Sequence, residues 1–372
     1  RWATHGAPTT PNAHPHLDCT KQIALIHNGI VENYQELKKE LVTKKHEFIS
    51  QTDSEVIVHL IEEYAKANSF ADAVRLAFNR LRGLSAILVV NAVSNEIIAA
   101  KNGSPLVVGI GENEYFIASD AAGIIKHTRK VVFVKDHEMV ILGNNLLLLS
   151  LPDGKPLVPD IETIDWNIED VDKGNYAHFM LKEIHEQPTV IRNIARNYDQ
   201  QILALADTIE KAKGTFFIGC GTAFHACLTG MYLFSKIASK HVNTAAASEF
   251  NYLEDFLTDE SLIIALSQSG ETIDIVEPLT RAKQKGSKIV GIVNTLGSTI
   301  YRMSDEKLLL GAGPEKAVAS TKAYIAKLSV LIMLSYAMIG KLDEAKDILL
   351  QAADEIEQFL KKQTDTIKSL AK

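Results

Sequence analysis

The stretch SLIIALSQSGET, residues 261–272, decides the fold of the second half of the chain. Its apolar first part has the length and composition of a buried strand, its end is rich in serine, and a helical pattern follows to about residue 285. A buried apolar strand followed by a turn and a helix is the unit from which parallel sheets are built. The stretch therefore predicts one strand of a parallel sheet with a polar loop at its carboxyl end.

The same unit recurs on both sides of this stretch. The run TFFIGC, residues 215–220, precedes a helical pattern from about Ala223 to Ser239. The runs KIVGIVN, residues 288–294, and KLLLGAG, residues 307–313, continue the alternation, and a last helix starts near Ala317. Repeated strand, turn and helix predict an α/β fold, and the right-handed crossover rule makes an open, doubly wound parallel sheet its simplest closure.

The first half of the chain has a different pattern. The apolar run IALI, residues 23–26, ends in His27-Asn28-Gly29, and helices are expected from about Glu32 and after the capping residues 52–54. Several short apolar runs follow between residues 85 and 142, separated by Asn, Gly and Ser at hairpin spacing. This pattern predicts antiparallel sheets with helices, the α+β class.

A proline-rich and acidic segment separates the two halves. We expect a first domain over residues 1–161, a linker over 162–177, a second domain over 178–342 and an amphipathic helix over 343–372. One face of that last helix carries an apolar stripe, formed by Ile348, Leu349, Ala352, Ile356, Phe359 and Leu360. Because such a stripe needs cover, we expect a further domain or a second subunit to bury it.

Composition limits the possible classes of function. The 372 residues are 46% hydrophobic and 23% charged, which excludes a disordered tail, a collagen and a coiled-coil rod. A net charge of −7 argues against nucleic-acid binding, which needs a basic surface. The most apolar stretch, residues 323–339, contains Lys327 and falls short of the about 20 residues that span a bilayer, so no membrane partner is expected.

The cysteine content indicates a compartment and excludes some scaffolds. The chain has three cysteines and no CxxC pair, which excludes a disulfide framework and a cysteine-rich zinc module. Free thiols fit a reducing environment, so a cytoplasmic location is expected.

The loop Ser267–Thr272 is the sharpest candidate for binding chemistry. The hydroxyls of Ser267, Ser269 and Thr272 and the amide of Gln268 lie where a helix begins. Unpaired N–H groups and the positive end of the helix dipole lie at the same place, so an anion can bind there, and phosphate is the expected anion. Simple N-capping is the alternative, but capping requires only one hydroxyl.

Two other strand-to-helix turns are expected on the same side of the sheet. The turn Gly219–Thr222 does not fit the dinucleotide fingerprint, because Phe224 stands where its last glycine would be, and no cofactor is expected. We interpret the turn as a second wall of the phosphate site, with Cys220 as a packing residue or, less favoured, a nucleophile. Ser320 either caps the last helix or faces the sugar end of a phosphorylated ligand.

Polar residues also gather in the loops of the first half. These are Arg1, Thr4, His5, His14, His16, His27 and Asp53. The pair His14 and His16 lacks the carboxylate or cysteine partners of a common metal site, so no metal site is predicted. Asn28-Gly29 can supply an oxyanion hole through a side-chain amide and a backbone N–H, but residue types alone favour a turn.

Seven motifs, in order along the chain, resemble those of the glutamine–fructose-6-phosphate aminotransferase (isomerizing) family. RWATHG at 1–6, NAHPH at 12–16, HNGI at 27–30 and TDSE at 52–55 resemble its class II glutamine amidotransferase domain. CGT at 220–222, SQSGET at 267–272 and VASTKA at 318–323 resemble its first sugar isomerase (SIS) domain. The resemblance implies that one domain hydrolyses glutamine and the other receives the ammonia on fructose 6-phosphate, giving glucosamine 6-phosphate and glutamate.

The resemblance also implies roles for individual residues. Arg1 would hold the α-carboxylate of glutamine through its planar donors, Asp53 would pair with the α-ammonium, and Asn28 and Gly29 would stabilise the oxyanion. The glutamine pocket would be shaped by Trp2, Thr4 and His5. The sugar phosphate would be bound by Thr222, Ser267, Gln268, Ser269 and Thr272, with Ser320 near the sugar hydroxyls.

The sequence departs from the family pattern in three respects. The family's glutaminase nucleophile is an N-terminal cysteine activated by its own α-amine, and Cys19 does not match its position. The second SIS domain of the family lies beyond the 372 residues. At the CGT loop, Ala223 stands where the family often has serine, which puts one phosphate contact in doubt.

We therefore expect a fragment that keeps its binding loops and lacks activity by itself, from a protein that forms a homodimer or larger assembly. The alternative is a non-catalytic SIS protein that binds sugar phosphates. A fructosamine-phosphate deglycase is disfavoured, because it does not explain the motifs of the first half.

Overall fold

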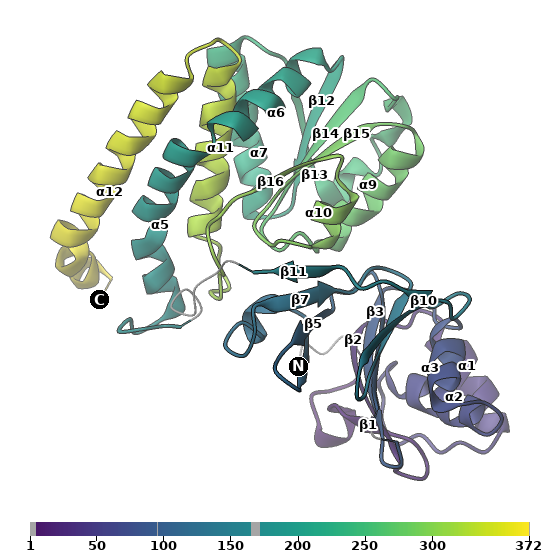
Figure 1. The fold of residues 1–372 in the computed structure, drawn as a ribbon. Helices are drawn as coiled ribbons and strands as arrows, with labels where there is room; N and C mark the ends of the chain where they lie inside the picture. The colour runs from purple at the N-terminus through teal and green to yellow at the C-terminus, as the bar shows by residue number, and fades with distance from the viewer. Residues whose placement is uncertain (1–4, 95, 165–171, 372) are drawn as a thin grey trace. The chain divides into compact units, whose positions relative to one another are not determined.

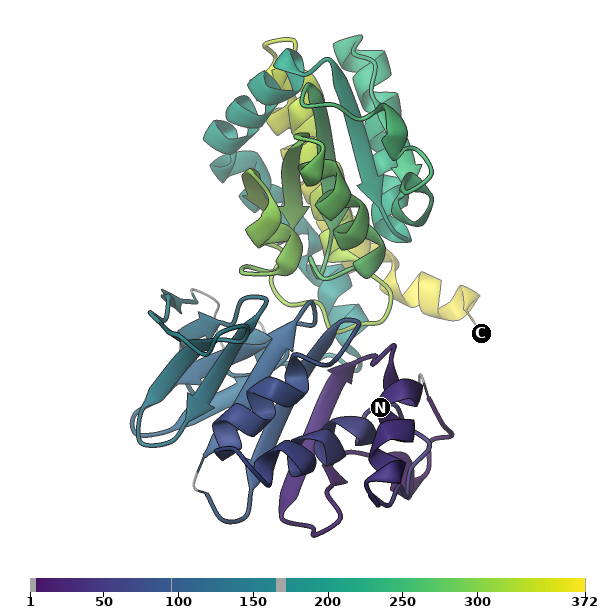
Figure 2. The same ribbon diagram turned by 90° about the vertical axis from the view of Figure 1, so that its right-hand side faces the viewer.

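The computed structural model describes residues 5–94, 96–164 and 172–371. The chain forms two compact units, Arg1–Asp165 and Trp166–Lys372, called here the first and second units (Figures 1 and 2). Within the described ranges, no helix is both long and apolar enough to cross a membrane.

The first unit contains two antiparallel sheets. The larger has the order β1-β2-β3-β4-β8-β9-β10 and the smaller the order β11-β7-β5-β6. The strands of the larger sheet are β1 (His16–Leu17), β2 (Ile23–Gly29), β3 (Ser85–Asn91), β4 (Ile97–Asn102), β8 (Glu138–Leu142), β9 (Leu146–Ser150) and β10 (Pro156–Leu157). Those of the smaller sheet are β5 (Val107–Ile110), β6 (Tyr115–Ala118), β7 (Lys130–Phe133) and β11 (Ile161–Thr163).

Alternating side chains on the larger sheet build two hydrophobic cores. Ile87 and Val89 of β3 pack with the helices α1 (Tyr34–Thr43), α2 (Glu55–Ala65) and α3 (Phe70–Phe78). Ala86, on the opposite face of the same strand, belongs to the core shared with the smaller sheet. Two short 3₁₀ turns, Thr10–Asn12 and Ala121–Gly123, complete the elements of this unit. The unit is therefore a layer of helices on a sheet, with the second sheet on the other face (Figure 1).

The second unit is built on one parallel sheet of order β13-β12-β14-β15-β16. Its strands are β12 (Gly214–Gly219), β13 (Asn243–Ala246), β14 (Ser261–Ser267), β15 (Lys288–Val293) and β16 (Glu306–Leu309). The chain starts in β12, moves to the edge strand β13 and then crosses back to β14. The order of strands therefore reverses between β12 and β14, which is where open α/β sheets bind ligands outside their carboxyl ends.

Helices cover both faces of this sheet (Figure 1). The hydrophobic core on one face includes residues of α5 (Phe179–Asn197), α6 (Asp199–Lys211), α7 (Thr222–Leu233), α11 (Lys322–Ala337) and α12 (Leu342–Leu370). The other packs against α8 (Ala247–Phe250), α9 (Ile273–Gln284) and α10 (Thr299–Met303). A short π-helix, Phe234–Ala238, continues α7, and a 3₁₀ turn spans Glu254–Phe256.

The expected classes of fold are confirmed, with differences in detail. The antiparallel sheets of the first unit and the doubly wound parallel sheet of the second are as the sequence predicts. Strand β11 continues two residues into the segment expected to be a linker, because it pairs with β7. The helix expected from residue 317 starts five residues later, at Lys322.

The last helix, α12, is partly buried by the second unit itself, whereas the sequence suggested that another domain or subunit would cover it. Ala345, Leu349 and Ala353 of α12 are buried in the core that also includes α5 and α11. Ile348 and Phe359, which were expected in the same stripe, are 41% and 53% exposed. The buried face therefore shares Leu349 and Ile356 with the expected stripe but also includes Ala345 and Ala353, whose small side chains allow α12 to approach α5 closely.

Candidate functional site

The loop that follows β14 gathers the predicted hydroxyls at one place. Ser267, the last residue of β14, is buried, and its Oγ accepts the N–H of Gly270 at 3.0 Å and lies 3.2 Å from Oγ1 of Thr272. The Oγ of Ser269 accepts the N–H of Glu271 at 3.2 Å. Gln268, Ser269 and Thr272 are half-buried, so a ligand from solvent can reach them. Helix α9 begins directly afterwards, at Ile273.

The neighbouring loop fixes the shape of this one. The carboxylate of Glu271 accepts the N–H of Thr299 at 2.8 Å and its hydroxyl at 2.7 Å. The N–H of Ile300 donates to the carbonyl of Gly270 at 2.9 Å, and the N–H of Asn294 donates to the carbonyl of Gln268 at 3.2 Å. These contacts use the Glu271 carboxylate and two backbone carbonyls of the loop. They therefore leave the loop's hydroxyl groups available to a ligand.

Thr222 lies at the end of the adjacent strand. Strands β12 and β14 pair in parallel, with Ile218 opposite Ala265, so the loops at their carboxyl ends lie side by side. Thr222 is exposed and is the first residue of α7. Two helices, α7 and α9, therefore begin at the point where the strand order reverses. Their N–H groups and dipoles favour an anion there.

The chemistry of Cys220 argues against a nucleophilic role. Burial raises the pKa of its thiol, with a further contribution from the carboxylate of Asp274, whose Oδ2 lies 4.0 Å from Sγ. A raised pKa keeps the thiol protonated, whereas the thiolate is the reactive form. The structure thus favours the interpretation of Cys220 as a packing residue.

Ser320 has a partner of its own. It lies in the loop after the edge strand β16, and its hydroxyl donates to Oε2 of Glu315 at 2.8 Å. The other oxygen of Glu315 accepts the N–H groups of Thr321 and Ala323 at the start of α11. The structure therefore joins Ser320 to the capping of α11.

The predicted glutamine-binding residues of the first unit are partly described. Arg1, Trp2 and Thr4 lie outside the described residues. The carboxylate of Asp53 is buried, and its Oδ2 accepts the N–H of Val31 at 2.8 Å. Its Oδ1 faces Nδ1 of His5 at 3.6 Å. The structure thus brings His5 and Asp53 together.

Asn28 and Gly29 end strand β2 rather than forming a turn. They pair with Ala86 and Ser85 of β3. Gly29 has φ +141°, and a Cβ there would come within 2.0 Å of the carbonyl oxygen of Leu84, so only glycine fits. The side chain of Asn28 is exposed and lines a cavity of 140 Å³ between β2, β3 and β6. This placement leaves the Asn28 amide open to a ligand.

Two histidines near Asn28, His27 and His16, form hydrogen bonds with hydroxyl side chains. Nδ1 of the buried His27 lies 2.9 Å from Oγ of Ser54, and its Nε2 lies 3.1 Å from Oγ of Ser85. Nε2 of His16 lies 3.1 Å from Oγ1 of Thr52. Residues 52–54 are thus bonded to strands β1 and β2, His27 of β2 is bonded in turn to β3, and Asp53 is positioned by this framework.

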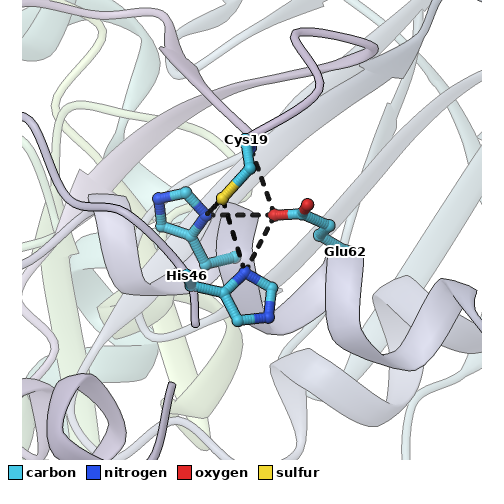
Figure 3. A group of neighbouring side chains, drawn as sticks. Cys19, His46 and Glu62 are labelled. Carbon is cyan, nitrogen blue, oxygen red and sulfur yellow. Dashed lines mark hydrogen bonds and ion pairs between the residues drawn. The ribbon is translucent and has the colours of Figure 1, made fainter. Parts of the chain in front are cut away.

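One group of chemically reactive side chains was missed by the sequence analysis. Cys19, His46, His59 and Glu62 lie together in the first unit (Figure 3). They are spread over more than 40 residues and follow no short metal-binding pattern, so the sequence analysis did not identify them.

Two family models match the chain. The glutamine amidotransferase domain model matches residues 8–126, and the SIS domain model matches residues 208–337. The chain is also similar to the solved C-terminal domain of glucosamine-fructose-6-phosphate aminotransferase from Francisella tularensis. That similarity has 28% identity and a TM-score of 0.46, and it covers 52% of this chain and 59% of the other.

Several curated proteins match nearly the whole chain. A glutamine–fructose-6-phosphate aminotransferase (isomerizing) of Methanothermobacter thermautotrophicus is 43% identical over 373 residues, which are 100% of this chain and 62% of the relative. Enzymes of the same name from Pyrococcus horikoshii and Clostridium perfringens are 44% and 39% identical, and they match 92% and 100% of this chain and 58% and 63% of their own lengths. The chain thus spans about three fifths of these relatives.

Together, the fold and the matches define a protein with a glutamine amidotransferase domain followed by an SIS domain. The chain is a relative of the isomerizing glutamine–fructose-6-phosphate aminotransferases, and the family resemblance seen in its motifs is confirmed.

Proposed function

We propose that this chain supplies the glutamine-binding and sugar-phosphate-binding parts of an enzyme that moves the amide nitrogen of glutamine to fructose 6-phosphate. The products are glucosamine 6-phosphate and glutamate. The names of the curated relatives and the two domain matches support this proposal. We place the domain boundaries at residues 1–161 and 178–342 with a linker over 162–177, and we expect the whole protein to be a cytoplasmic homodimer or larger.

The observation that carries the proposal is the position of the Ser267–Thr272 loop. Its hydroxyls crowd at the start of α9, beside the start of α7, where the strand order of a parallel sheet reverses. A phosphate dianion placed there would accept hydrogen bonds from hydroxyls and helix N–H groups and would lie at two positive helix ends. Simple capping does not require this number of donors.

In this arrangement the sugar phosphate replaces contacts within the loop. The hydroxyls of Ser267 and Thr272, 3.2 Å apart, turn toward the phosphate, and the half-buried Gln268 and Ser269 complete one wall. Thr222 supplies the opposite wall from the first turn of α7.

The glutamine half of the site is proposed for the first unit. Asp53 would hold the α-ammonium through Oδ1, the oxygen that faces His5, because Oδ2 is bonded to the backbone of Val31. The Asn28 side chain and the Gly29 N–H would stabilise the oxyanion that forms when the amide carbon is attacked. Arg1, Trp2 and Thr4 keep the roles in glutamine binding that the family resemblance implies.

Calorimetric titration of the 372-residue chain with fructose 6-phosphate and with inorganic phosphate tests the proposal. We expect the double variant Ser267→Ala/Thr272→Ala to bind both ligands at least tenfold more weakly, since a hydrogen bond to a charged group contributes about 1.5–3 kcal/mol. Thr280→Ala is the matched control, because this exposed threonine of α9 donates to the carbonyl of Val276 and lies away from the loop. An unchanged isotherm for the double variant would refute the phosphate site.

A further inference from the structure

Four side chains with metal-binding atoms converge beside helix α2. They are Cys19, His46, His59 and Glu62, and Sγ, the two Nδ1 atoms and a carboxylate oxygen all lie within 4.8 Å of one another. Figure 3 shows the three labelled residues pointing inward toward one another. The cluster is distinct from the glutamine and phosphate sites described above.

Four of the six distances between these atoms are close to those of a tetrahedral zinc site. Sγ of Cys19 lies 3.7 Å from Nδ1 of His46 and 3.6 Å from Nδ1 of His59. Oε2 of Glu62 lies 3.0 Å and 3.1 Å from the same two nitrogens. Zinc bond lengths and tetrahedral angles require about 3.6 Å between sulfur and nitrogen and about 3.3 Å between nitrogen and oxygen.

The outer nitrogens of both histidines face carboxylates. Nε2 of His46 lies 3.1 Å from Oε2 of Glu63, and Nε2 of His59 lies 3.7 Å from Oε1 of Glu55. Metal-binding histidines characteristically donate their second N–H to such a partner, which fixes the ring and its tautomer. Here both rings present Nδ1 to the centre. Nε2 of His46 is within hydrogen-bond distance of its carboxylate, whereas Nε2 of His59 has no hydrogen-bond partner among the described residues.

Backbone N–H groups contact two of the four side chains. The N–H of Glu47 donates to Sγ of Cys19 at 3.4 Å, and the N–H of Cys19 donates to Oε2 of Glu62 at 3.2 Å. The ligands also come from separate segments, with Cys19 between β1 and β2, His46 after α1, and the other two on α2. A metal ion would therefore join the turn before β2 to both helices.

The geometry points to a structural zinc site formed by Cys19, His46, His59 and Glu62. Thiolate, imidazole and carboxylate at tetrahedral spacing favour Zn²⁺ over Mg²⁺ or Ca²⁺, which prefer oxygen ligands. All four positions are protein side chains, so the site is closed and serves stability. Glu55, beside His59, also accepts the N–H groups of Ile49 and Ser50, so the metal would stabilise the segment that leads to Asp53.

Metal titration of the whole chain tests this inference directly. The reduced, chelator-treated protein is titrated with Zn²⁺ against a chromophoric chelator, and with Co²⁺ as a spectroscopic probe. We expect one equivalent of either metal, a thiolate-to-cobalt charge-transfer band, and a rise in Tm with Zn²⁺. We expect Glu63→Gln to weaken Zn²⁺ binding about 10–100-fold, the range for an outer-shell partner, and Cys19→Ser to weaken it further.

Two variants control for unspecific metal binding and for misfolding. His241→Ala removes an exposed histidine of the second unit and is expected to leave zinc binding unchanged. Cys19→Ser alters a residue at the exposed rim, so it keeps the test valid if His59→Ala fails to fold. Failure to bind one equivalent of Zn²⁺, equal binding by Cys19→Ser and the unchanged chain, or a cobalt spectrum without a thiolate band would each overturn the inference.

Discussion

Gly270 shows how closely two loops approach each other beside the proposed phosphate site. It has φ +67°, and a Cβ at this position would lie 2.0 Å from Oγ of Ser298. A side chain therefore meets both a strained backbone conformation and a steric overlap. Both the backbone conformation of the turn and the contact with Ser298 therefore require glycine at this position.

We predict that Gly270→Ala lowers the free energy of unfolding by more than about 1 kcal/mol and weakens phosphate binding. Gly340→Ala separates the two causes, because Gly340 has φ +70° with nothing within 4 Å of its Cβ position. Urea denaturation of both variants measures the difference. If both variants lose the same free energy of unfolding, the steric overlap with Ser298 does not contribute to the effect of Gly270→Ala.

Single residues also show what the sequence could and could not predict. The crowding of Ser267, Ser269 and Thr272 at a helix start was visible in the sequence, because local chemistry alone indicates an anion site. Asn28-Gly29 was ambiguous, since its pairing with β3 depends on residues more than 50 positions away. The cluster around Cys19 was invisible for the same reason, because only the fold brings its members together.

Helix α11 is apolar around almost its whole circumference and carries a lysine inside the core. Lys327 is 1% exposed, and within the described part of the chain its Nζ has no hydrogen-bond partner. Burial lowers the pKa of Lys327 to about 8, while a nearby carboxylate, Glu315, acts in the opposite direction. The unfolded chain holds this proton up to about pH 10.5, the folded chain only to about pH 8.

This difference fixes the sign of the pH dependence. Between those two values the unfolded state binds more protons, so stability rises with pH. We predict that Lys327 adds about 2–3 kcal/mol to the free energy of unfolding of the second unit between pH 7 and pH 10.

Lys327→Met should remove this rise and stabilise the unit at pH 7 by a similar amount. Denaturant titrations at both pH values measure the effect, and Lys368→Met, at an exposed position of α12, should behave like the unchanged chain. A Lys327→Met variant that keeps the full rise would contradict the prediction.

At the level of elements, long and strongly patterned segments were predicted well. Strands β12, β14, β15 and β16 and the helices that follow them were visible from their apolar runs. The edge strand β13 was missed, because four residues of sequence NTAA have no distinctive pattern and depend on pairing with β12. Helix α3 and strand β9 were missed as well, and the short strands β10 and β11 lay in the proline-rich segment.

The whole molecule combines two units with separate cores and, in our proposal, separate ligands. The 372 residues carry proposed contacts for glutamine and for sugar phosphate, and we expect none of their three cysteines to act as the family's nucleophile. Binding and chemistry can therefore be tested apart on this polypeptide.

We predict that the purified 372-residue chain binds fructose 6-phosphate and does not release ammonia from glutamine. An enzyme-coupled ammonia assay measures this, with a glutaminase of known activity as the positive control. Clear turnover would show that another residue acts as nucleophile. In the complete protein, sugar-phosphate binding without any ammonia release or product formation would favour the non-catalytic alternative.

Strand β14 has one more consequence for the proposed site. All seven of its residues are buried, and it is paired on both sides. Its amides should be among the last of the second unit to exchange with deuterium, because exchange there requires opening of the sheet centre. A loop that follows so rigid a strand loses little conformational entropy when a ligand binds. The cost of ordering the loop therefore reduces the affinity only slightly.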